Sequence, residues 1–195
     1  MLNIAVFASG RGSNFEALYH ALKKDNSPAR IVMVLSNNSQ SGALALARSF
    51  NIPAFHISQR QFTSSETFNE KIVELLRLHA VNFVVLAGYM KKIDVSIVRA
   101  FHNRIINIHP ALLPKFGGEG MFGMHVHEAV IAAGEKFSGA TVHYIDEEYD
   151  RGDVIDQETV SIDEHETAET LAAKVLRAEH VLLPRVVKKF AAASE

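Results

Sequence analysis

Apolar runs rich in β-branched residues alternate with segments of helical period along the first half of the chain. Strands are predicted over residues 2–8, 30–36, 54–57, 84–86 and 105–108. Helices are predicted over residues 14–24, 42–50 and 94–101. A further helix should begin after Thr63, whose hydroxyl can cap the free amides while Glu66 reaches back. Strands this uniformly apolar must be buried on both faces, so the pattern predicts a doubly wound α/β fold, a mostly parallel sheet with helices on both faces.

The pattern changes after Pro114. Residues 115–124 hold four glycines and show no period, which predicts a long loop of the kind that often carries function. Later strands are predicted over 139–144 and 154–160, and a closing helix over 167–190. With 195 residues and 48% hydrophobic content, the chain can bury one well-packed core. We therefore expect a single domain over residues 1–195.

Composition narrows the range of partners. The formal net charge is −2 and the pI is near 6.6, with lysines and arginines scattered, which argues against nucleic-acid or anionic-membrane binding. The chain has no cysteine, which excludes disulfides, thiolate metal sites and cysteine nucleophiles and suits a reducing compartment. No basic segment opens the chain as in a signal peptide, and no apolar stretch approaches the ~20 residues of a membrane span. We expect a cytoplasmic protein, monomeric or homodimeric, acting on small molecules.

Asn107 and His109 stand at the end of an apolar strand that Pro110 should terminate. Residues two apart in extended backbone project from the same face, so the amide and the imidazole should lie side by side. The carboxyl edge of an open α/β sheet is where ligands bind, which makes this pair a candidate for polarising a carbonyl or moving a proton. The alternative is a histidine that only caps the strand and bonds a loop.

The segment Ser9–Asn14 reads Ser-Gly-Arg-Gly-Ser-Asn, follows the first strand and opens the first helix. Glycines allow close backbone approach there, and the helix start offers free N–H groups to an anion. The spacing differs from the dinucleotide fingerprint, and the lysine of the nucleotide P-loop is missing. A phosphate of mononucleotide size fits best, and a simple strand-to-helix turn capped by Asn14 is the alternative.

Histidines and acidic residues cluster late in the chain. His125 and His127, together with His109, His143 and Asp150, allow a metal-site hypothesis, although ten histidines make chance pairs common. We expect His127 instead to cap a helix over residues 128–133. The acidic turn that holds Asp150 is by itself most simply solvated, but the preceding strand could lead it back over the ligand edge.

Four segments together resemble the phosphoribosylglycinamide formyltransferase family, folate-dependent enzymes of purine synthesis. They are Ser9–Asn14, Ala87–Met90, Asn107–Lys115 with its Asn-Ile-His-Pro and Leu-Leu-Pro-Lys motifs, and Gly139–Tyr144 followed by Asp150-x-Gly152. The likeness runs in order from residue 1 to about residue 180. Four motifs in register make it specific, and the larger relatives that share the core, methionyl-tRNA formyltransferase and formyltetrahydrofolate deformylase, carry extra domains for which this chain has no room.

The resemblance implies a role for each matching residue. Asn107, His109 and Asp150 match the catalytic trio of the family. Gly12, Ser13 and Asn14 are implied to hold the ribonucleotide phosphate, and Glu179 to contact the glycinamide ribonucleotide. The folate co-substrate, 10-formyltetrahydrofolate, is implied to bind along Met90, Lys91, Lys92, Ile93 and Asp146, and no metal is implied.

Three departures from the family pattern stand out. The loop after Lys115 is longer, which leaves its closure open. Lys91 and Ser65 stand where arginines are common, so the glutamate tail of the folate could instead meet Arg60 or Lys92. Leu176 replaces a polar residue one turn before Glu179, which removes one candidate nucleotide contact.

The implied reaction is direct attack of the ribonucleotide amine on the formyl carbon through a tetrahedral intermediate. Asn107 and an imidazolium at His109 would stabilise the oxyanion, and Asp150 would favour that charged imidazole and help remove the amine proton. Two other classes stay open: a metal-dependent hydrolase that uses the clustered histidines, and a non-catalytic nucleotide-binding module that uses only the loop at residues 10–14.

Overall fold

The computed structural model describes residues 1–25, 27–147 and 152–193. Its first half contains β1 (Leu2–Phe7), α1 (Ser13–Lys24), β2 (Ala29–Ser36), α2 (Gly42–Ser49), β3 (Ala54–His56), the short 3₁₀ helix η1 (Gln59–Gln61), α3 (Ser65–Leu78) and β4 (Phe83–Leu86). Its second half contains α4 (Val95–Ala100), β5 (Ile105–His109), α5 (Met124–Ala132), β6 (Phe137–Tyr144), β7 (Val154–Ser161) and α6 (Ala168–Ala192).

Seven strands form one sheet in the order β3-β2-β1-β4-β5-β6-β7. Strands β1 to β5 pair in parallel, and β6 and β7 add an antiparallel hairpin at one edge. The chain winds outward from β1 to β3 and then returns to place β4 on the other side of β1. This reversal is a topological switch point, and such points open a crevice at the carboxyl ends of the strands.

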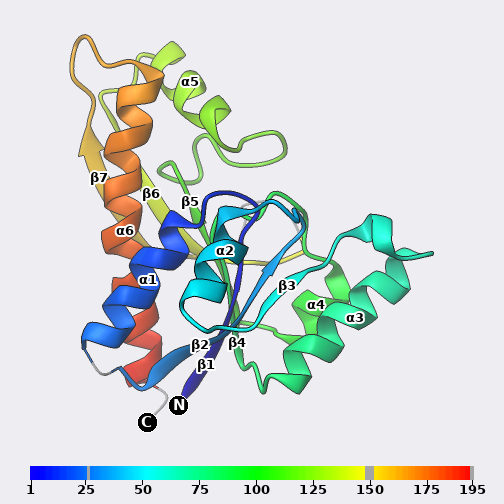
Figure 1. Cartoon of the computed structure of the whole chain (residues 1–195). Helices are drawn as coiled ribbons and strands as arrows, with labels where there is room; N and C mark the ends of the chain where they lie inside the picture. The colour runs from blue at the N-terminus through cyan, green and yellow to red at the C-terminus, as the bar shows by residue number, and fades with distance from the viewer. Residues whose placement is uncertain (26, 148–151, 194–195) are drawn as a thin grey trace.

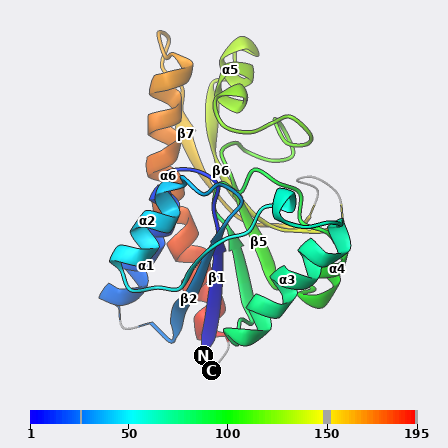
Figure 2. The same cartoon turned by 45° about the vertical axis from the view of Figure 1, so that its right-hand side comes forward.

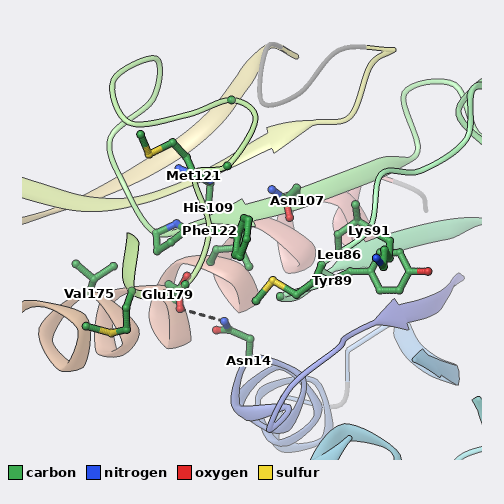
Figure 3. Close-up of a pocket in the computed structure, with 18 of the residues that line it drawn as sticks. Asn14, Leu86, Tyr89, Lys91, Asn107, His109, Met121, Phe122, Val175 and Glu179 are labelled. Carbon is green, nitrogen blue, oxygen red and sulfur yellow. Dashed lines mark hydrogen bonds between the residues drawn. The ribbon is translucent and has the colours of Figure 1, made fainter. Parts of the chain in front are cut away.

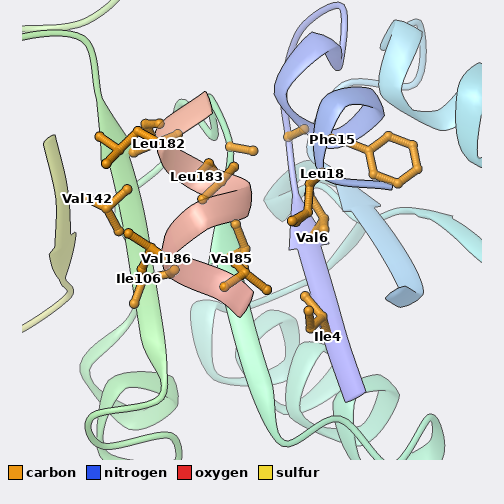
Figure 4. Close-up of a cluster of buried hydrophobic side chains, with 14 of the residues drawn as sticks. Ile4, Val6, Phe15, Leu18, Val85, Ile106, Val142, Leu182, Leu183 and Val186 are labelled. Atoms are coloured by element: carbon orange, nitrogen blue, oxygen red, sulfur yellow. The ribbon is translucent and has the colours of Figure 1, made fainter. Parts of the chain in front are cut away.

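Helices cover both faces of the sheet (Figures 1 and 2). Alternate side chains of the central strands divide between two cores: Ile4 and Val6 face α1, α2 and α6, while Ala5 and Phe7 face α3 and α4. Figure 4 shows the first core, where Leu182, Leu183 and Val186 of α6 meet strand residues such as Val85, Ile106 and Val142. The predicted doubly wound, mostly parallel α/β fold is therefore confirmed.

Glycine is required at Gly139 in β6, where the strand lies close to the backbone of β7. A Cβ at this position would lie 2.0 Å from the carbonyl oxygen of Glu158 in β7. The same strand carries Thr141, whose buried hydroxyl donates to Ala111 O at 2.6 Å and accepts from the Leu113 amide at 3.0 Å. The hairpin therefore holds the turn that follows β5.

Two helix starts differ from their predictions. Helix α3 is capped by Ser64, whose hydroxyl accepts from the Thr67 amide, so the predicted cap at Thr63 is wrong by one residue. Helix α5 begins at Met124 after Gly123, so His127 lies inside the helix and does not cap it. In the described ranges, no helix is long and apolar enough to cross a membrane.

Candidate active site

A pocket of about 700 Å³ lies at the edge of the sheet where β4 and β5 end (Figure 3). This volume is within the range of small-molecule sites. Its walls come from the loops after β1, β4 and β5, from residues 118–124 and from one face of α6. Nine of the predicted site residues line it: Asn14, Met90, Lys91, Lys92, Ile93, Asn107, His109, Asp146 and Glu179.

Asn107 and His109 both line this pocket from β5, as their spacing predicts. In the antiparallel pairing with β6, Asn107 lies opposite His143. Asn107 Nδ2 lies 3.1 Å from His143 Nε2, and His143 Nδ1 lies 2.9 Å from the carbonyl oxygen of Tyr144. A carbonyl can only accept, so His143 carries its proton on Nδ1, and its Nε2 accepts from the Asn107 amide. This hydrogen bond therefore fixes the orientation of the Asn107 side-chain amide, with Nδ2 towards His143.

His109 is almost fully buried, and its ring is held by the loop that follows the turn. Its Nε2 lies 2.8 Å from the carbonyl oxygen of Phe116, so the ring nitrogen donates this hydrogen bond. Phe116 has a backbone φ of 56°, in the left-handed region that non-glycine residues rarely adopt. The conformation of the glycine-rich segment therefore helps to orient the imidazole.

The loop before α1 approaches α2 so closely that Gly12 cannot carry a side chain. Gly12 has φ of 86°, and a Cβ there would lie 2.7 Å from Ala43 Cα. It occupies the N-cap position of α1, so the free amides of the first turn follow it. Arg11 and Asn14 line the pocket, whereas Gly12 and Ser13 are not among its lining residues. The sequence pattern predicted no role for Arg11, although this residue lies within the segment Ser9–Asn14.

Asn14 and Glu179 are 165 positions apart and meet in the pocket, with Asn14 Nδ2 donating to Glu179 Oε2 at 3.1 Å (Figure 3). Glu179 is 7% exposed. Burial raises the pKa of its carboxyl to about 7, and the hydrogen bond from Asn14 opposes this rise. A substantial fraction of this carboxyl is therefore protonated near neutral pH.

The loop after β4 forms the wall that was predicted to bind folate. The Ser9 hydroxyl accepts from the Met90 amide at 2.8 Å and so fixes this loop to the end of β1. Ile93 is buried, whereas Met90 is 49% exposed at the pocket. Tyr89 packs edge-on against Phe7, and burial raises the pKa of its phenol to about 12, so its hydroxyl stays neutral.

The two histidines of α5 have opposite environments. His125 has a side chain that is 68% exposed, near Glu128, and His127 is 5% exposed and lines the pocket. Burial, and then the neighbouring His109, lower the pKa of His127. Among the described residues, no three histidine, aspartate or glutamate side chains gather in a metal-binding group. Asp150, the third predicted catalytic residue, lies outside the described residues.

Fold and pocket together define a doubly wound α/β protein with its ligand site at the switch point and an amide and an imidazole beside it. The chain belongs to the formyl transferase family, whose model matches residues 2–187. This confirms the resemblance drawn from the four motifs.

Named relatives refine the comparison. The chain is 44% identical to the chloroplastic phosphoribosylglycinamide formyltransferase of Vigna unguiculata, covering 95% of this chain and 59% of the relative. It is 40% identical to the phosphoribosylglycinamide formyltransferase of Bacillus subtilis, covering 97% and 94% of the two chains. The crystal structure of the enzyme of that name from Brucella melitensis superposes with a TM-score of 0.91 at 39% identity, over 98% of this chain and 96% of that one.

Proposed function

We propose that this protein transfers the formyl group of 10-formyltetrahydrofolate to the amine of glycinamide ribonucleotide, a step of purine biosynthesis. One observation carries the proposal: the pocket brings Asn107 and His109 of β5 together with Asn14 of the phosphate-type loop and Glu179 of α6. Relatives matched over nearly their full length bear the name of this activity. A single pocket of about 700 Å³ can place two small substrates beside the same two polar groups.

The acceptor belongs at the end of the pocket formed by α1 and α6. Its phosphate would meet the amides that follow Gly12, with the hydroxyl of Ser13 and the guanidinium of Arg11 close by. Its sugar and amine would then extend past Asn14 and Glu179 towards β5. Helix starts bind anions through free N–H groups, and the location of Asn14 in the pocket wall supports this orientation.

The formyl donor belongs at the opposite wall. Leu86, Met90 and Ile93 supply apolar contacts there, which suits the ring system of a folate. Lys91, Lys92 and Asp146 line the same side, where they would meet the polar edges and the carboxylates of the co-substrate. The formyl carbon would thereby lie next to Asn107 and His109.

Asn107 would donate to the oxygen that becomes negative as the amine attacks. Its amide is already oriented because one N–H is bound by His143, so the donor needs no reorganisation during the reaction. His109 would supply a second donor from Nδ1 of its charged imidazole, because its Nε2 already donates to the carbonyl oxygen of Phe116. A positioned donor of this type typically contributes ~3 kcal/mol to transition-state stabilisation.

Asp150 would complete the trio by keeping the imidazole of His109 charged and by helping to remove the amine proton, directly or through water. The intermediate would then collapse: the carbonyl re-forms, the bond between the formyl carbon and N10 of the folate breaks, and the removed proton passes to N10 as tetrahydrofolate leaves. This role rests on the match of Asp150-x-Gly152 to the family motif. The amine is itself the nucleophile, so the reaction needs neither a covalent enzyme intermediate nor a metal ion. We further propose that the protein acts on small molecules in the cytoplasm, as a monomer or homodimer; the cysteine-free sequence suits a reducing compartment.

Substrate exchange tests this proposal. Purified protein is first treated with a chelator and then incubated with 10-formyltetrahydrofolate. The acceptor is either glycinamide ribonucleotide or free glycinamide, and a control reaction contains no acceptor. We expect consumption of the donor only with the ribonucleotide. Equal rates with free glycinamide would refute the assignment of the ribose-phosphate contacts, and loss of turnover that zinc restores would favour a metal-dependent reaction.

A further inference from the structure

Two buried polar atoms in the wall of the pocket lack a hydrogen-bond partner in the part of the chain that the structure describes. They are Oδ1 of Asn14 and Nδ1 of His127. Leaving a buried polar atom without a partner costs about 1–3 kcal/mol, so such atoms require an explanation. Both residues line the same pocket as Glu179, whose carboxyl already accepts from Asn14 Nδ2.

We propose that His127 contacts the acceptor substrate, with its Nδ1 bonded to a hydroxyl of the sugar, and that Asn14 Oδ1 and Glu179 complete this hydroxyl-binding subsite. The inference rests on the proposed function, because that function supplies a ribonucleotide as the acceptor. It adds a residue that the sequence pattern assigned to a helix cap.

The chemistry of these groups favours hydroxyls over phosphate. The pKa of His127 is lowered by burial and by His109, so its imidazole is neutral, and the Glu179 carboxyl is partly protonated near neutral pH. Asn14 offers an acceptor oxygen, because its Nδ2 is used by Glu179. Neutral groups that offer acceptors suit sugar hydroxyls, which both donate and accept. The next group along the acceptor from a phosphate at the α1 start is its ribose, which places hydroxyls beside Asn14.

The local fold explains why His127, and not His125, lines the pocket. Helix α5 starts at Met124, one turn before the predicted start at residue 128, and it follows Gly123, which has φ of 57°. The helix face that carries Val126, His127 and Val130 is buried. His125 lies on the exposed side of the same turn and is not among the residues that line the pocket. The pair therefore offers a matched control two residues away.

Calorimetric titration of glycinamide ribonucleotide, without the formyl donor, tests the contact on the intact protein. His127→Leu removes the polar atom and should weaken binding about 3- to 10-fold, the worth of one neutral hydrogen bond. His127→Asn places a polar atom near the position of Nδ1 and should bind within about 2-fold of wild type. His125→Leu should bind as wild type does.

Thermal unfolding separates a contact with substrate from a structural role. Replacing an unpartnered buried polar atom with an apolar group should leave the midpoint of His127→Leu equal to or above that of wild type. An acceptor without the sugar hydroxyl that His127 contacts should bind more weakly to wild type, and His127→Leu should not weaken it further.

The inference is overturned if His127→Leu binds the ribonucleotide as wild type does, if His127→Asn binds as weakly as His127→Leu, or if weaker binding comes with a lower midpoint. Turnover by the wild type and by His127→Leu is measured separately. Binding that depends on His127 without any formyl transfer would support the subsite and refute the proposed reaction, whereas transfer that is indifferent to His127 would refute the subsite alone. A wild type that does not bind the ribonucleotide contradicts both.

Discussion

Replacing Glu179 with glutamine should remove a loss of stability that the wild type suffers as the pH rises. The carboxyl has a pKa of about 7 in the fold against 4.5 for the ordinary group, because burial penalises its charged form. Between these two values the folded protein binds more protons than the unfolded chain. The protonated Glu179 carboxyl therefore makes its full contribution to the stability of the fold below pH 4.5, and this contribution is lost as the pH rises through 7.

The size of this loss follows from the shift. A difference of about 2.5 pKa units at ~1.36 kcal/mol per unit gives a change of about 3 kcal/mol in the free energy of unfolding. For a chain of this length that corresponds to roughly 6–12 °C in melting temperature. Glutamine keeps the shape of the side chain and can still accept from Asn14, but it does not ionise. The free energy of unfolding of the variant should therefore not decrease with rising pH on account of this residue.

Thermal or urea unfolding at pH 4.5 and pH 8 measures the effect. The difference between the two pH values should be smaller in Glu179→Gln than in wild type by about 3 kcal/mol. Glu70→Gln, on the exposed side of α3, is the control and should follow wild type. Parallel pH dependences for Glu179→Gln and wild type would show that the fold does not hold this carboxyl protonated.

Three other substitutions test separate parts of the account. His143→Phe removes the acceptor that orients the Asn107 amide, so kcat for formyl transfer should fall about 10- to 100-fold. Calorimetry should show unchanged binding of the ribonucleotide. An unchanged kcat would contradict the positioning role of His143. Gly12→Ala forces a Cβ against α2 at positive φ, so urea unfolding should show a loss of more than about 1 kcal/mol, and wild-type stability would show that the loop can shift. Asp150→Asn should lower kcat at least ~100-fold with both substrates still bound, whereas Asp153→Asn should stay near wild type; the reverse pattern would mean that the wrong carboxylate was assigned.

Local patterns predicted most of the fold because they reflect burial directly. Strands such as β1 are apolar on both faces, and only a sheet covered on both sides can bury them. The start of α5 was missed because the prediction relied on a polar side chain as cap, whereas the chain begins this helix after a glycine with positive φ and no side-chain cap. The cap of α3 was displaced by one residue because Thr63, Ser64 and Ser65 all offer a hydroxyl.

The candidate site was partly predictable for the same reason. Asn107 and His109 line the pocket because a period of two puts them on one face of β5. The pairing of Asn107 with His143 depends on the register of an antiparallel hairpin, which no local pattern contains. The contact between Asn14 and Glu179 depends on how α6 packs beside α1, so only the resemblance indicated a shared role for these two residues.

The fate of the formyl carbon tests the central claim most directly. A donor labelled at the formyl carbon is mixed with the protein and glycinamide ribonucleotide, and the label is traced in a single turnover. Direct attack by the amine predicts that the label leaves the folate and appears in the formylated ribonucleotide at the same rate, with no label bound to protein. Release of labelled formate at the same rate with and without the ribonucleotide would show that water is the acceptor, and the proposed transfer would be wrong.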